Sequence, residues 1–178
     1  MNAQLQTLFA TIEQKKAEIL NDVQRMSEED FTRQPAPNQW SMSQVLAHLQ
    51  TSEMLSTLYM LKKFQGIETY SDTGIQHELL MLLVKLSQRL PLRYKAPTVV
   101  ASKTPSYNTK QELIANWQKS REALRSLLEK FQDHQLKKKV YRHPVAGLIN
   151  IQHALIFFHE HLIHHTPQIK RLLREAER

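Results

Sequence analysis

Long runs of residues free of helix breakers, with apolar side chains at helical spacing, are the feature that most constrains this chain. There are only 3 glycines and 7 prolines among its 178 residues. In the first such run, residues 3–25, apolar side chains recur three, four and seven positions apart, as on one buried stripe of an α-helix. The stripe consists of Leu5, Leu8, Phe9, Ile12, Ile19 and Val23. Helices of this kind bury their stripes by packing against one another.

Capping signals predict where two further helices begin. Ser41 is followed three residues later by Gln44, and Thr109 by Glu112 in the same way. Both pairs have the capping-box pattern, in which the first side chain accepts a hydrogen bond from the helix backbone. We therefore predict a second helix that runs to about residue 65, a third that begins after Thr109, and a last one from about residue 151.

A shorter apolar helix is predicted over about residues 74–90, ended by Pro91. The breaker-rich segment 91–108 is predicted to be an extended crossover, and segments 26–39 and 137–150 are predicted to be loops. The expected fold is therefore all-α. It is a four-helix bundle with an additional short helix between the second and third main helices, in a single domain over 1–178.

Composition narrows the kinds of site that the chain can hold. With no cysteine it can form neither a disulfide nor a thiolate metal site, so any metal must bind to His, Asp or Glu. The net charge is +7, but the 24 Lys and Arg are scattered, apart from the run Lys137, Lys138 and Lys139. Nucleic-acid binding is therefore not expected.

The sequence shows no sign of a membrane location. Its start lacks the apolar run of a secretory signal, and no stretch reaches the roughly 18 apolar residues of a membrane span. We therefore expect a soluble, cytoplasmic protein.

Five of the nine histidines lie in the last helix. At about 100° per residue, His161 and His165 fall inside the apolar arc of that helix, His153 and His164 fall off it, and His159 is at its margin. His161 and His165 are one turn apart on one face, so their imidazoles can converge on one ion. Such a pair is also typical of core histidines that only form hydrogen bonds.

The second helix adds His48, which falls within its buried stripe. Its simpler interpretation is a core histidine bonded to a carbonyl. Three histidines on the apolar faces of two helices would each need a polar partner, and a single ion would satisfy all three. We therefore predict a divalent metal site on His48, His161 and His165. Zinc or nickel is the first expectation, with iron, manganese or copper as alternatives.

Three segments resemble a known family in their order and spacing. They are Trp40-Ser41-x3-Val45-Leu46-Ala47-His48-Leu49 followed by Glu53, then His143-Pro144-x2-Gly147, and then His161-x3-His165-x2-Gln168-Ile169. Together they resemble the DinB/YfiT-like superfamily, nearly from end to end of the chain. The resemblance implies a four-helix bundle whose metal is bound by His48, His161 and His165. It also implies a small-molecule substrate, a low-molecular-weight thiol as a cofactor in some members, and a homodimer in many.

Other polar residues receive simpler interpretations. Pro167 is expected to kink or end the last helix near Thr166, because proline lacks the N–H and clashes with the preceding turn. Glu53 is expected in a surface salt bridge, with the alternative that it orients a histidine. His164 is expected to face solvent, and Gln168 is not assigned to the site.

Three classes of function fit these observations. The first is a metal-dependent enzyme that transfers a thiol or another nucleophile to a small electrophile, or hydrolyses a small substrate. The second is a non-catalytic metal-binding or stress-response module with the same fold. The third, a nucleic-acid binder, lacks a recognition motif among the predicted helices.

Overall fold

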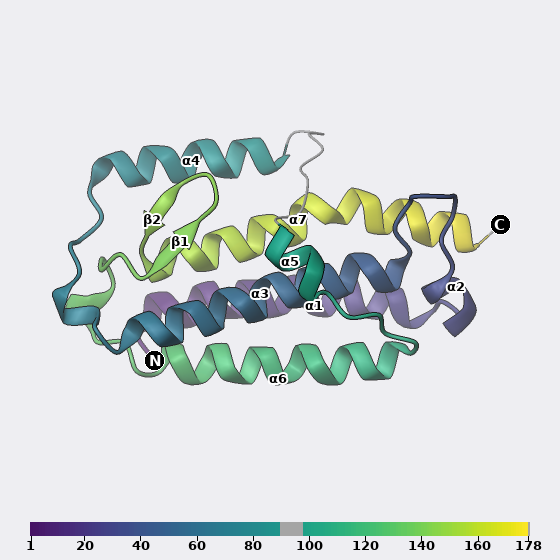
Figure 1. Ribbon diagram of the computed structural model, residues 1–178, viewed down its shortest axis with the longest axis horizontal. Coiled ribbons are helices and arrows are strands. Elements are labelled where there is room, and N and C mark those ends of the chain that lie inside the picture. The colour runs from purple at the N-terminus through teal and green to yellow at the C-terminus, as the bar shows by residue number, and fades with distance from the viewer. Residues whose placement is uncertain (90–97, 178) are drawn as a thin grey trace.

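Four long helices form a bundle in the computed structural model, which describes residues 1–89 and 98–177. They lie side by side along the long axis of the molecule (Figure 1), as the sequence predicted. Each contacts two of the others, which gives the cyclic order α1, α7, α3, α6. Their bounds are α1 (Ala3–Gln24), α3 (Met42–Phe64), α6 (Lys110–Leu128) and α7 (Ile151–Ala176).

The capping residues fix where these helices begin. Ser41 Oγ accepts from the backbone N–H of Gln44 at 3.2 Å, and Gln44 Oε1 accepts from the N–H of Ser41 at 2.9 Å. Thr109 and Asn150 cap α6 and α7 in the same way, through side-chain oxygens that accept a backbone N–H three residues later. The predicted capping box at Ser41 is thus confirmed, whereas at Thr109 only the bond from Glu112 N–H to the threonine side chain is seen.

The additional helix α4 (Ile75–Arg89) lies where the sequence predicted it. It packs along α7 at the edge of the bundle (Figure 1). Its inward side chains Met81 and Val84 are buried. The predicted stop at Pro91, and the predicted crossover over residues 91–97, lie outside the described residues.

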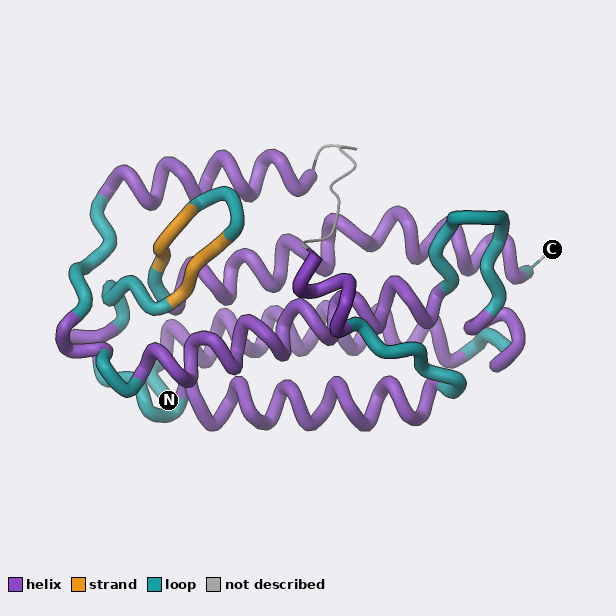
Figure 2. Tube along the Cα trace, viewed as in Figure 1, coloured by secondary structure: helices purple, strands orange, loops and turns teal. Residues whose placement is uncertain are grey.

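Short elements occupy segments that were predicted to lack them (Figure 2). The predicted loop 26–39 contains a five-residue helix, and the end of the predicted extended crossover also forms a helix, which packs on α3. The loop before α7 contains a two-stranded hairpin. Their bounds are α2 (Glu28–Thr32), α5 (Thr98–Lys103), β1 (Tyr141–His143) and β2 (Gly147–Ile149); two 3-10 turns are η1 (Ile67–Thr69) and η2 (Asp133–Gln135).

The hairpin is held by a side chain as well as by its strands. The strands are antiparallel, with Arg142 opposite Leu148. His143 Nδ1 accepts hydrogen bonds from the backbone N–H groups of Val145 and Ala146, at 3.1 and 3.0 Å. Gly147 has a φ of +68°, a left-handed conformation that glycine adopts without steric cost. These two bonds make the His143 side chain part of the turn between the strands.

Helix α7 passes through Pro167, so it does not end near Thr166, which was one of the two outcomes predicted for this proline. It continues to Ala176. A proline inside a helix costs about 3 kcal/mol, but the turns that follow it bury Ile169 and Leu172 in the core. Burying a large apolar side chain contributes about 1.5–3 kcal/mol. Packing against the bundle therefore outweighs the missing backbone hydrogen bond.

Within residues 1–89 and 98–177, none of the helices combines the length and the apolar character needed to cross a bilayer.

Candidate metal centre

The imidazoles of His48, His161 and His165 meet between α3 and α7. One ring nitrogen from each of the three lies within 4.8 Å of the corresponding atoms of the other two. The Nε2 atoms of His48 and His161 are 3.3 Å apart. The ring centroid of His165 lies 5.3 Å from the ring centroid of His48 and 4.9 Å from that of His161. The structure thus brings together the three histidines that the sequence singled out.

The two helices deliver these rings through their register. The capping box at Ser41 fixes the start of α3 and so sets the position of His48 about two turns into it. His161 and His165 lie one turn apart on α7 and therefore share a face. His48 is buried, whereas the other two are half-buried, so the group lies between the core and the surface.

Burial keeps all three imidazoles neutral at neutral pH. It lowers the pKa of His48 and of His165 from 6.5 to about 4, and that of His161 well below its ordinary value. The neighbouring histidines lower these pKa values further. Neutral imidazole is the form that binds metal ions, so every ring offers a lone pair without first losing a proton.

Gln168 lies against the group, although the sequence analysis did not assign it to the site. Its Oε1 is 3.0 Å from His165 Nδ1. An amide oxygen accepts, so His165 Nδ1 carries the hydrogen and Nε2 holds the lone pair. A bond of this kind to the outer nitrogen is what fixes the tautomer of a metal-binding histidine. Because α7 continues through Pro167, Gln168 stays in helical register one turn after His165.

Aromatic rings flank the three histidines. Phe157 stacks on His161 with an interplanar angle of 13° and a centroid distance of 5.4 Å. Trp40, which is partly buried, lies 5.2 Å from His48 at a tilt of 55°. These apolar walls lower the local dielectric and restrict the rotation of the rings.

Two other histidines of α7 lie elsewhere than the sequence predicted. His164, expected to face solvent, is half-buried, and its Nδ1 lies 2.9 Å from the backbone oxygen of Gln88 on α4. His153, expected off the buried face, is buried, and its Nε2 lies 3.0 Å from Glu78 Oε1. The prediction treated α7 as a helix with one buried face, but α4 covers a second face.

Glu53 is also placed differently from the prediction of a surface salt bridge. It is buried and accepts from Trp117 Nε1 at 2.8 Å and from Arg121 Nη2 at 2.7 Å. Burial raises the pKa of its carboxyl group, although Arg121 and Trp117 oppose that shift. Its hydrogen bonds join α3 to α6 and none reaches a histidine, so the alternative role of orienting a histidine is not seen either.

Comparison with known proteins identifies the family. The DinB superfamily matches residues 11–169 of the sequence. Among solved structures, the fold is similar to that of YfiT from Bacillus subtilis, described as a probable metal-dependent hydrolase with an unusual four-helix bundle topology. The two chains are 20% identical, with a TM-score of 0.60 over 98% of this chain and 88% of the other. At that identity the likeness shows the fold alone. No curated protein matches the sequence significantly. Since the superfamily match spans most of the chain, this protein belongs to the DinB superfamily.

Proposed function

We propose that this protein binds one divalent metal ion on His48, His161 and His165 and uses it in a reaction on a small molecule. The observation that carries the proposal is the meeting of three neutral imidazoles, with their ligand atoms within 4.8 Å of one another. Zinc or nickel suits such nitrogen ligands, and iron, manganese or copper are the alternatives.

The residues around the group fit a bound cation. The Nε2 atoms of His48 and His161 face each other at 3.3 Å. In a direct hydrogen bond one of these nitrogens must carry the hydrogen and the other must accept it. A cation between them would instead accept a lone pair from each nitrogen. Gln168 holds the lone pair of His165 on Nε2 by accepting from Nδ1. Among the described residues, the group of potential metal ligands here contains no carboxylate, which leaves positions on the ion for water or substrate.

We infer that the reaction is hydrolysis, or transfer of a small thiol to an electrophile. An ion with three imidazole ligands acts as a Lewis acid and lowers the pKa of a coordinated water or thiol. The description of YfiT as a probable metal-dependent hydrolase supports the hydrolytic variant. The apolar walls formed by Trp40 and Phe157 would exclude bulk water from the reacting group.

Elemental analysis of the purified protein tests the metal site. We expect about one ion per chain in the wild type and a loss of the ion in His48→Ala, His161→Ala and His165→Ala. His134→Ala is the matched control, because His134 is exposed and lies against Glu68 rather than in this group. Wild-type metal content in all three site variants would contradict the proposal.

Turnover is tested on the metal-loaded protein. The substrates are a panel of small esters and amides, with and without added thiol, and His48→Ala is run in parallel. We expect turnover by the wild type that disappears in the variant. A loaded protein that binds its ion but turns over none of these substrates would instead support the non-catalytic metal-binding alternative.

A further inference from the structure

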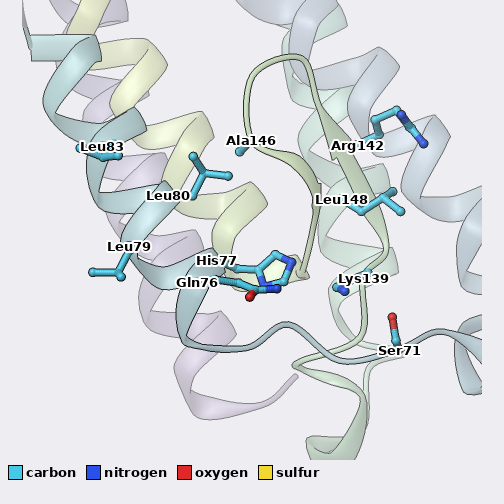
Figure 3. Close-up of a pocket in the computed structure, with 10 residues that line it drawn as sticks. All are labelled: Ser71, Gln76, His77, Leu79, Leu80, Leu83, Lys139, Arg142, Ala146 and Leu148. Atoms are coloured by element: carbon cyan, nitrogen blue, oxygen red, sulfur yellow. The ribbon is translucent and has the colours of Figure 1, made fainter.

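A groove runs between α4 and the hairpin formed by β1 and β2 (Figure 3). Its volume is about 600 Å³, which is within the range of small-molecule sites in proteins. None of the three histidines of the candidate metal centre lines it. The groove is therefore a separate place on the molecule where a ligand could bind.

The two walls of the groove are apolar. Helix α4 lines it with Leu79, Leu80 and Leu83, and the hairpin lines it with Ala146 and Leu148. Figure 3 shows Leu80 pointing across the groove toward the hairpin. A hydrocarbon chain that lies between these walls removes apolar surface from water, on the ligand and on the protein alike. The walls therefore favour a ligand with an apolar part.

Polar side chains gather at one end of the groove. Ser71, Gln76, His77 and Lys139 line this end, which is the lower end in Figure 3. They come from the segment before α4, from the first turn of α4 and from the segment before the hairpin. A backbone hydrogen bond of 3.1 Å, from the N–H of Lys139 to the oxygen of Ser71, joins the first and the last of these segments. This polar end therefore has a fixed base.

The polar end carries a positive charge that no neighbouring carboxylate neutralises. Lys139 is half-buried, and none of the described carboxylates forms an ion pair with it. Asp72 pairs instead with Lys138, at 3.2 Å. Glu78 pairs with His153, at 3.0 Å. Since the described residues that line the groove also include no carboxylate, its charge favours an anion.

The other polar groups at this end can donate hydrogen bonds. His77 Nδ1 lies 3.0 Å from the backbone nitrogen of Gly74 and 3.3 Å from its oxygen. In the shorter contact Nδ1 accepts, which places the hydrogen of the neutral ring on Nε2. The Gln76 amide and the Ser71 hydroxyl are exposed and have hydrogens to donate. One ammonium group among neutral donors matches a head group with a single negative charge.

We propose that this groove binds an amphipathic carboxylate, an anion with one linear alkyl chain. Its head group bonds to Lys139, and its chain lies between Leu80 and the hairpin. Residues 76–83 span about 10 Å along α4, which accommodates an extended chain of about eight carbons. The groove is a second ligand site, distinct from the metal centre proposed above. His48→Ala should therefore bind the carboxylate as the wild type does.

Isothermal titration of the full chain with octanoate tests the head group. We expect octanoate to bind, and n-octyltrimethylammonium, which has the same chain and the opposite charge, not to bind. Lys139→Met should weaken octanoate binding by about 10-fold, because it removes a charged hydrogen-bond donor. Lys137→Met is the matched control. It removes the same charge from an exposed side chain that does not line the groove, and should leave the affinity unchanged.

The alkyl chain is tested by its length and by its contact with α4. From hexanoate to octanoate to decanoate, we expect the affinity to rise about two- to fourfold for each added methylene. Leu80→Ala should weaken octanoate binding by about fivefold, because it removes apolar surface from the wall. Leu82→Ala is its control, since Leu82 is 52% exposed on the same helix and does not line the groove. Circular dichroism establishes that the variants keep their helices.

Four results would overturn the proposal. They are a wild type that does not bind octanoate, equal affinities in Lys139→Met and Lys137→Met, equal affinities in Leu80→Ala and Leu82→Ala, and a loss of binding in His48→Ala. The last result would place the carboxylate in the metal centre. Octanoate binding by a wild type that holds no ion would leave this site standing and contradict the metal site alone.

Discussion

At the residue scale, the hydrogen bond between His165 Nδ1 and Gln168 Oε1 determines which nitrogen faces the proposed ion. Removing a partner of this kind typically costs 10- to 100-fold in metal affinity. We therefore expect Gln168→Leu to weaken metal binding by about that factor, measured by competition with a chelator. Gln152→Leu on the same helix should leave the affinity unchanged, because among the described residues the side chain of Gln152 bonds to Gln4 and not to the three histidines. Equal affinities in the two variants would contradict this role.

His143 makes stability depend on pH in a defined direction. Burial lowers its pKa from 6.5 to about 4, so in this interval the unfolded chain binds a proton that the folded chain does not. Stability should therefore fall as the pH drops from 6.5 toward 4. For this group the loss between pH 7 and pH 5 is about 2 kcal/mol.

His143→Asn isolates that contribution. An asparagine oxygen can still accept from the backbone of the turn, as His143 Nδ1 does, but the side chain no longer titrates. Urea titrations of the metal-free protein at pH 7 and at pH 5 measure this effect. Between these two pH values we expect the free energy of unfolding to fall by about 2 kcal/mol less in the variant than in the wild type. If the free energy of unfolding falls equally in the variant and in the wild type between these two pH values, His143 is not the source of the pH dependence.

At the scale of elements, a buried charge pair joins α3 to α6. Arg121 is buried and bonds to Glu53 at 2.7 Å, while its Nε lies 3.3 Å from Glu13 on α1. Arg121→Met would leave the Glu53 carboxylate buried without its partner, which costs about 3–5 kcal/mol. Arg125→Met on the same helix removes only an exposed pair with Glu129 and should cost less than about 1 kcal/mol. Thermal or urea unfolding of both variants measures the difference.

The elements that the sequence predicted are those with long periodic stripes or strong caps. Helix α3 was located from Ser41 and Gln44, and its apolar stripe placed His48 on the buried face of the helix. Helix α2 and the hairpin strands are only five and three residues long, too short for periodicity to show. Their formation depends on side-chain bonds such as the Ser27 cap and the His143 turn.

The residues that were predicted wrongly depend on contacts between elements. A helical wheel of α3 places Glu53 at the edge of the stripe, and only the arrival of Arg121 from α6 explains why it is buried. In the same way, His153 is buried because α4 brings Glu78 against it. Neither partner can be read from the periodicity of the helix concerned. Long-range packing therefore decided these positions.

At the scale of the whole molecule, the proposed ion would connect helices that are remote in sequence. His48 and His161 are 113 residues apart and belong to different helices. A ligand that binds only the folded state adds about 2.7 kcal/mol of stability at a concentration 100 times its dissociation constant. We expect a chelator to lower the melting temperature of the wild type and to leave that of His48→Ala unchanged. A wild type that is insensitive to the chelator would contradict metal binding.

The predicted bundle and the superfamily are confirmed, and the single domain over residues 1–178 and the cytoplasmic location stay predictions. The sequence identified the three histidines because two of them share a helical face and the third lies in a buried stripe. It did not assign Gln168 to the site, because a kink or an end of the helix at Pro167 left the placement of Gln168 open.

The separation of His48 from His161 and His165 also sets an order of events during protein synthesis. A nascent chain carries the imidazole of α3 long before α7 has been made, and one histidine alone holds a divalent ion weakly. Capture of the proposed ion would have to wait until the final helix has docked beside α3. Metal loading would therefore be among the last steps in maturation of the protein, and a truncated chain lacking α7 would emerge unable to retain the ion.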